Sequence, residues 1–124
     1  MKLLLDTHAA LWLLSGDERL SESARRHVTD GANPVLLSAA VVWEIAIKRS
    51  LGKLVVPDEY LSVLLDAGAQ ALAVSVDHAA AVQRLPPHHR DPFDRMLIAQ
   101  AARRRFIVVT ADRRFADYDV PTLA

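Results

Sequence analysis

Residues 106–112 read Phe-Ile-Val-Val-Thr-Ala-Asp and contain the clearest β-strand signal of the chain. The run from Phe106 to Thr110 is apolar rather than alternating and rich in β-branched residues, which is typical of a strand buried in a parallel sheet. Such a sheet needs helices on both faces, so the stretch predicts an α/β fold. Asp112 follows the strand and places a carboxylate near its carboxyl end.

The N-terminus repeats this arrangement. Lys2 to Leu5 predicts a short buried strand, and Asp6 closes it. Two further strands are expected at 35–37 and 71–76, and Val120 begins a short edge strand. Helices are expected between the strands, which predicts a right-handed parallel sheet with short connections. The expected helices cover residues 8–15, 21–30, 39–51, 57–67, 77–85 and 91–105, with Ser38, Asp77 and Asp91 among the N-caps.

Length and composition bound the class of protein. A chain of 124 residues with 52% hydrophobic residues is expected to form one domain, residues 1–124, with a real core. No apolar run approaches the roughly 18 residues that span a bilayer, so no membrane association is expected. The absence of cysteine excludes disulfides and thiolate metal sites and fits a cytoplasmic protein.

Charge is unevenly distributed although the formal net charge is zero. The segment from Arg84 to Arg114 carries eight arginines and three aspartates. Arginine suits planar, bidentate contacts with phosphate groups. The alternative for residues 103–105 is structural, because cations at the end of a helix complement its dipole.

Four acids are expected to meet at one edge of the sheet: Asp6, Glu44, Asp94 and Asp112. Ligands of parallel sheets bind beyond the carboxyl ends of the strands, where Asp6 and Asp112 fall directly. At ~5 Å and an effective dielectric of ~20, each pair of carboxylates repels by roughly 3 kcal/mol. Three close carboxylates then cost about 10 kcal/mol, which is comparable to the whole stability of a domain. The cluster therefore needs protons or a cation, and oxygen ligands favour Mg²⁺ or Mn²⁺.

Each acid also has an ordinary structural interpretation. Asp6 and Asp112 suit caps or turns, and Asp94 suits the first turn of a helix. Glu44 is more informative, because residues 39–47 are otherwise apolar and a buried carboxylate needs a partner. That partner is either Lys48, one turn on, or a metal ion. The coincidence of all four acids under one topology favours the metal site.

Four stretches together resemble a known family. They are Leu3-Leu4-Leu5-Asp6-Thr7-His8, Ser38-Ala39-Ala40-Val41-Val42-Trp43-Glu44-Ile45, Asp91-Pro92-Phe93-Asp94-Arg95-Met96-Leu97-Ile98-Ala99-Gln100-Ala101 and Val109-Thr110-Ala111-Asp112-Arg113-Arg114-Phe115. In this order they resemble the PIN domain, and within it the VapC-like toxins of bacterial toxin–antitoxin pairs. The third stretch is the most specific.

The resemblance implies a three-layer fold with a central parallel sheet of about five strands between helices. It implies that Asp6, Glu44 and Asp94 are the core metal-binding and catalytic acids, that Asp112 is a more variable fourth, and that Thr110 lies near the metal. Asp91 keeps its capping role. The implied activity is a Mg²⁺-dependent endoribonuclease, with Mn²⁺ as a substitute. A metal-activated water would then hydrolyse RNA phosphodiester bonds.

Further residues and partners complete these expectations. Arg95 and Arg113 are candidate RNA phosphate contacts, and His88 and His89 are expected to be solvated in a proline-rich loop. The helix at 8–14 is apolar almost all round, so it is either buried or docks a partner. The resemblance implies an antitoxin in a groove and a homodimer.

Other classes fit the sequence less well. A haloacid-dehalogenase phosphatase needs Asp-x-Asp, whereas His8 stands second after Asp6. A receiver domain lacks its acidic pair and lysine, and no P-loop motif is present. The remaining alternative is a catalytically silent PIN-like domain that binds protein or RNA. A metal titration followed by thermal melting separates it from the enzyme.

Overall fold

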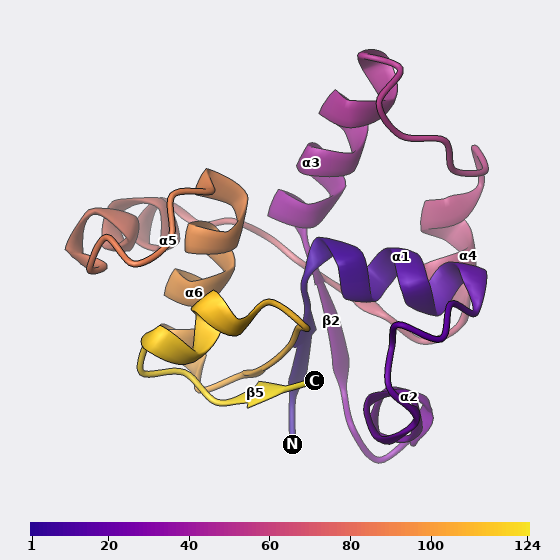
Figure 1. The fold of residues 1–124 in the computed structure, drawn as a ribbon, viewed down its shortest axis with the longest axis horizontal. Helices are drawn as coiled ribbons and strands as arrows, with labels where there is room; N and C mark the ends of the chain where they lie inside the picture. The colour runs from indigo at the N-terminus through magenta and orange to yellow at the C-terminus, as the bar shows by residue number, and fades with distance from the viewer.

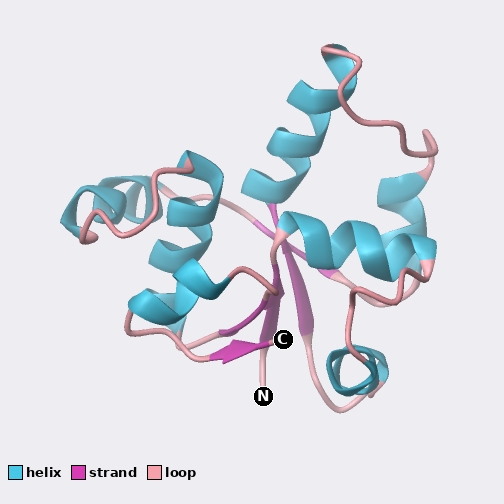
Figure 2. Cartoon of the chain, in the orientation of Figure 1, coloured by secondary structure: helices cyan, strands magenta, loops and turns pink.

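The computed structural model describes all 124 residues. Its centre is a five-stranded sheet with the strand order β3-β2-β1-β4-β5, in which every pairing is parallel (Figure 2). This confirms the predicted α/β fold with a parallel sheet. The strands are β1 (Leu3–Leu5), β2 (Val35–Ser38), β3 (Gln70–Leu72), β4 (Ile107–Val109) and β5 (Thr122–Leu123).

Helices flank this sheet on both sides, which confirms the three-layer prediction. Helices α1, α2 and α4 lie on one side and α5 and α6 on the other, while α3 extends from the end of β2 (Figure 1). None of the helices is both long and apolar enough to cross a bilayer. The helices are α1 (Thr7–Ser15), α2 (Glu22–Thr29), α3 (Ala39–Ser50), α4 (Tyr60–Asp66), α5 (Val76–Ala81) and α6 (Pro92–Arg104), with short 3₁₀ helices η1 (Val82–Arg84) and η2 (Arg113–Asp117).

The sheet changes winding direction at β1. The chain proceeds from β1 to β2 and β3 on one side, then crosses to β4 and β5 on the other. Leu5 at the end of β1 is in register with Val109 at the end of β4, and the backbone N–H of Asp6 donates to the Val109 carbonyl at 3.1 Å. Ligands of parallel sheets bind in the crevice at such a switch point.

The core explains why the strand sequences are apolar without alternation. Residues Leu3, Leu4 and Leu5 are fully buried, as are Val108 and Val109, because both faces of the central strands are covered. Leu97 and Ile98 of α6 belong to the same buried cluster. The two strands that lead to Asp6 and Asp112 therefore lie in the core of the protein.

Local capping explains most of the helix boundaries. The side chains of Asp6, Ser38 and Asp91 accept hydrogen bonds from the first turns of α1, α3 and α6, as the sequence predicted. The prediction for α5 was wrong in detail. Its N-cap is Ser75, which forms a capping box with His78, rather than Asp77. The third strand is also shorter than predicted and ends at Leu72.

Candidate metal centre

A polar pocket of about 220 Å³ lies beyond the carboxyl ends of β1 and β4. All four predicted acids line it, although they come from distant parts of the chain. No hydrophobic side chain takes part in the lining. The lining residues are Asp6, Thr7, His8, Glu44, Lys48, His89, Asp91, Asp94, Asp112 and Arg114.

Asp6 combines a structural and a functional position. It is buried, and its Oδ1 accepts a hydrogen bond from the backbone N–H of Ala9 at 2.7 Å. Burial raises the pKa of Asp6, against the opposing effects of the Thr110 hydroxyl and the Ala9 N–H. The carboxylate therefore caps α1 and still lines the pocket, so the two interpretations of this residue are compatible.

Glu44 projects from α3 into the same pocket and is 6% exposed. The Thr7 hydroxyl donates to its Oε1 at 2.5 Å, and the Lys48 ammonium donates to its Oε2 at 2.5 Å. The ion pair considered as the alternative is thus present. It does not withdraw Glu44 from the site, because Thr7 and Lys48 line the pocket as well.

Asp94 and Asp112 have opposite electrostatic environments. Burial raises the pKa of Asp94 to about 7, and the neighbouring carboxylates of Asp91, Asp6, Glu44 and Asp112 add to the increase. Partial burial also acts to raise the pKa of Asp112. Hydrogen bonds from the side chain and backbone of Arg114 and from His89 outweigh it and leave that pKa below its ordinary value. Without a cation, the site keeps one acid ionised and another close to protonation.

Two further predicted residues lie beside these acids. The Thr110 hydroxyl oxygen accepts a hydrogen bond from the backbone N–H of Asp112 at 3.0 Å and lies close enough to lower the pKa of Asp6. Asp91 Oδ1 accepts from the backbone N–H groups of Phe93 and Asp94. Asp91 therefore starts α6 and orients the helical turn that carries Asp94.

The prediction that His89 is solvated was wrong. His89 is 3% exposed, whereas its neighbour His88 is exposed as expected. Its Nε2 lies 3.0 Å from Oδ2 of Asp94 and 3.0 Å from Oδ2 of Asp112. One donor atom from each of these residues falls within 4.8 Å of the others. The sequence did not reveal this position, because the path of the proline-rich loop depends on contacts with a residue distant in the sequence, Tyr118.

The structure also changes the expectation for Arg95. Its guanidinium donates to the backbone carbonyls of Pro86, His89, Val82 and Leu85 and to the Tyr118 hydroxyl. These contacts occupy the donors that a phosphate would need, so Arg95 fixes the loop before α6. Arg113 is exposed, as a phosphate contact requires. Arg114, which was not singled out, lines the pocket and donates two side-chain hydrogen bonds to Asp112.

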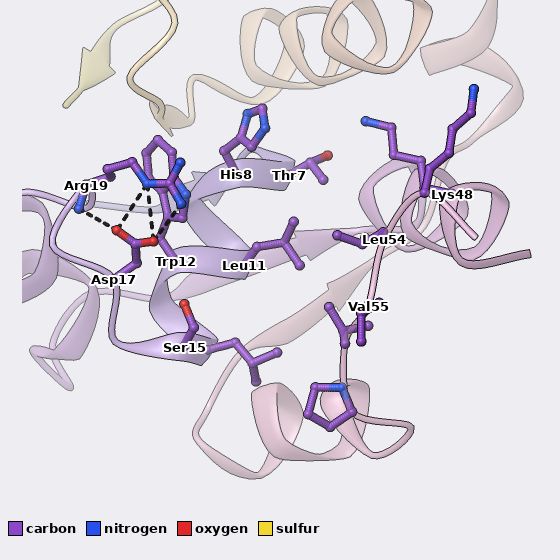
Figure 3. A pocket seen from close by; sticks show the side chains of 14 residues that line it. Thr7, His8, Leu11, Trp12, Ser15, Asp17, Arg19, Lys48, Leu54 and Val55 are labelled. Carbon is purple, nitrogen blue, oxygen red and sulfur yellow. Dashed lines mark hydrogen bonds and ion pairs between the residues drawn. The ribbon is translucent and has the colours of Figure 1, made fainter. Parts of the chain in front are cut away.

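A second hollow, the α1 groove, adjoins the acid pocket and has a volume of about 620 Å³. It lies between α1 and the segment 53–57, with Leu11 and Leu54 facing each other across it (Figure 3). Leu11 and Trp12 are only half-buried, so the apolar helix is not fully covered by its own chain. Arg19 stacks over the Trp12 ring at 5.2 Å and pairs with Asp17 at the groove's end (Figure 3).

The donor set of the acid pocket suits a hard divalent cation. Most of its possible ligand atoms are carboxylate and hydroxyl oxygens, beside the imidazoles of His8 and His89, and it has no thiolate. Burial, and after it the neighbouring carboxylates, raise the pKa of Asp94, so the pocket opposes a full set of negative charges. A cation relieves that opposition directly, so the residues present fit a metal centre.

Comparison with known proteins supports this architecture. Residues 3–121 match the PIN domain family. The ribonuclease VapC16 of Mycobacterium tuberculosis is 45% identical over 64 residues, which cover 48% of this chain and 44% of that protein. The matched region is therefore less than half the length of that relative.

Solved structures share the fold over nearly the whole chain. The VapBC2 structure from Rickettsia felis, bound to a promoter DNA fragment, superposes with a TM-score of 0.74 at 12% identity and covers 99% of this chain and 98% of that one. DNA-bound VapBC from Salmonella typhimurium gives a TM-score of 0.71 at 16% identity, covering 99% and 97%. Identities this low establish the fold alone.

Proposed function

The chain belongs to the PIN domain family, and from this premise we propose that it is a metal-dependent endoribonuclease, the toxin of a toxin–antitoxin pair. The observation that carries the proposal is the convergence of Asp6, Glu44, Asp94 and Asp112 on one polar pocket. The match to a ribonuclease over 48% of the chain supports the same activity. The likeness to VapBC toxin–antitoxin structures supports the toxin assignment.

We propose Mg²⁺ as the cation, with Mn²⁺ as a substitute. Asp6, Asp94 and Asp112 would hold it, with Glu44 in support, because their oxygens suit these ions. A cation bound there would neutralise charge at the scissile phosphate and lower the pKa of the attacking water. The surrounding residues orient the acids: the cap of α1 fixes Asp6, Thr7 and Lys48 fix Glu44, and Arg114 fixes Asp112.

RNA approaches this pocket past basic side chains. Lys48 and Arg114 line it and are partly exposed, at 42% and 61% of their side-chain surface. Arg113 lies one residue away and is exposed. The acids alone would repel the phosphates of an RNA backbone. These basic side chains offset part of that negative charge.

The activity test uses purified protein and single-stranded RNA with Mg²⁺, with Mn²⁺ and with EDTA. We expect cleavage with either metal and none in EDTA, and the Asp94→Asn variant should be inactive throughout. Sequencing the RNA ends produced after induced expression then identifies the substrate and the cut position. Binding of Mg²⁺ without any cleavage of RNA would instead support a catalytically silent binding module.

We further propose that a cognate antitoxin occupies the α1 groove, that the protein forms a homodimer, and that it acts in the cytoplasm. The half-buried apolar side chains of α1 support the first point, because a contiguous exposed apolar surface marks an interaction site. Size-exclusion chromatography tests the assembly. A clean monomer, unchanged when the antitoxin is added, would count against both partners.

A further inference from the structure

The hydrogen bonds of His89 determine which of its ring nitrogens carries the proton. The backbone N–H of Asp91 donates to Nδ1 at 3.1 Å. A backbone N–H is only a donor, so Nδ1 must present a lone pair. The neutral imidazole has one proton, which therefore lies on Nε2.

In this tautomer the Nε2–H group of His89 is a hydrogen-bond donor toward the acid pocket. Nε2 is hydrogen bonded to Oδ2 of Asp112 at 3.0 Å and lies 3.0 Å from Oδ2 of Asp94. A nitrogen that carries a proton has no lone pair for a metal ion. To ligate a cation, Nε2 would have to pass its proton to Nδ1, which would then face the N–H of Asp91 donor to donor.

The surroundings hold the ring in this orientation. The side chain is 2% exposed and packs edge-on against Phe115, with the ring centroids 5.9 Å apart. The backbone N–H of His89 donates to the Tyr118 hydroxyl at 2.9 Å, and that hydroxyl donates to the Pro86 carbonyl at 2.7 Å. Arg95 donates to the His89 carbonyl at 3.3 Å. Both the backbone and the ring are therefore fixed before any ligand arrives.

We propose that His89 is a positioning residue: as its neutral Nε2–H tautomer it donates to the Asp112 carboxylate, with the Asp94 carboxylate 3.0 Å away on the same nitrogen, and stays outside the cation's coordination shell. The proposal rests on the metal centre of the proposed function. Two adjacent carboxylates repel each other, and a fixed neutral donor between them offsets part of that repulsion without competing for the cation's place. Outer partners of this kind orient ligands, and their loss typically weakens metal affinity about 10- to 100-fold.

Calorimetric titration of the full chain with Mn²⁺ and with Mg²⁺ measures the affinity directly. For His89→Ala we expect the Kd for the metal to rise about 10- to 100-fold. The kcat at saturating metal should change much less than this Kd. His89→Gln should recover most of the affinity, because its side-chain amide places an N–H near the position of Nε2. His88→Ala, at the exposed neighbour, serves as the matched control and should leave the Kd unchanged.

Pulsed electron paramagnetic resonance of the Mn²⁺-loaded wild-type protein gives an independent test that needs no variant to fold. We expect no strong ¹⁴N coupling from a directly bound imidazole. Such a coupling, or an unchanged Kd in a folded His89→Ala variant, would overturn the positioning role. Failure of the wild-type protein to bind either metal is a different result, because it would reject the metal centre itself.

Discussion

The acid pocket and the α1 groove share Thr7, His8 and Lys48 in their linings, yet they are built in opposite ways. The pocket has no hydrophobic lining residue and takes its side chains from the ends of two strands, from the start of α1, from α3, α6 and η2, and from the loop before α6. The groove takes most of its lining from two continuous stretches, α1 and residues 53–57. The pocket thus gathers single residues from many elements, whereas the groove brings two continuous stretches of the chain together.

The two regions also carry different unfavourable features, namely close negative charges in the pocket and exposed apolar surface in the groove. In the pocket, burial and the close carboxylates raise the pKa of Asp94, and a cation or proton relieves the unfavourable charge. In the groove, half-buried side chains such as Leu11 and Trp12 leave apolar surface in water, and a partner's apolar surface relieves that cost. Changes in the pocket should therefore alter charge-dependent properties, and changes in the groove should alter association.

The largest expected effect concerns Asp6, which both caps α1 and lines the pocket. Asp6→Asn keeps an oxygen for the Ala9 N–H but removes the charge, so RNA cleavage should fall at least about a hundredfold, as when a single charge-stabilising group is lost. The melting temperature of the Asp6→Asn variant in EDTA should not fall below that of the wild-type protein. Asp6→Ala should be equally inactive and also less stable by about 1 kcal/mol, because the cap is lost. Cleavage by the Asn variant at the wild-type rate would remove Asp6 from the metal centre.

The next effect is a pH dependence confined to the pocket. The folded-state pKa of Asp94, about 7, is above the ordinary aspartate value of 3.8, so the folded protein retains a proton that the unfolded chain has lost. In EDTA, stability should fall as the pH rises through this interval, by at most about 4 kcal/mol. Urea unfolding between pH 4 and 8 measures it. Asp94→Asn should flatten the profile, and identical wild-type and variant profiles would contradict the assignment.

A change in the groove should act on the partner and spare the chemistry. Leu11→Arg places a charge on the half-buried face of α1 and should weaken antitoxin binding by about 2 kcal/mol, or roughly 30-fold. RNA cleavage by the free protein should stay near the wild-type rate. Val76→Asp, at an exposed apolar residue of α5 outside the groove, is the control. Equal binding by both variants would place the antitoxin elsewhere.

The smallest effect is expected at Arg113, the exposed basic residue near the acid pocket. Arg113→Ala in an Asp94→Asn background, which prevents cleavage, should weaken RNA binding a few-fold and reduce the salt dependence by about 0.7 in the logarithmic slope. Stability should not change, because Arg113 is exposed. Arg95→Ala should instead lower the melting temperature, since it leaves backbone carbonyls without a donor. Thermal melting and fluorescence anisotropy distinguish the two arginines.

Most of the fold and the four acids were predictable from the sequence. The strand ends at Asp6 and Asp112, and the caps at Ser38 and Asp91, are local signals that short stretches carry. The clearest errors concern His89 and Arg95, because the loop between α5 and α6 has no periodic pattern. Its path depends on Tyr118 from the far end of the chain, which contacts the backbone of both Pro86 and His89.

The sequence by itself determined the alternation of strands and helices and the placement of an acid after β1 and after β4. It could do so because apolar runs, caps and stop signals act over a few residues. Only the tertiary structure decided which side chains are buried together and what they bond to. It paired Glu44 with Thr7 and Lys48, turned Arg95 toward backbone carbonyls and seated His89 between two carboxylates. Burial, tautomer and pKa depend on neighbours that are distant in sequence, and chain folding alone brings those neighbours together.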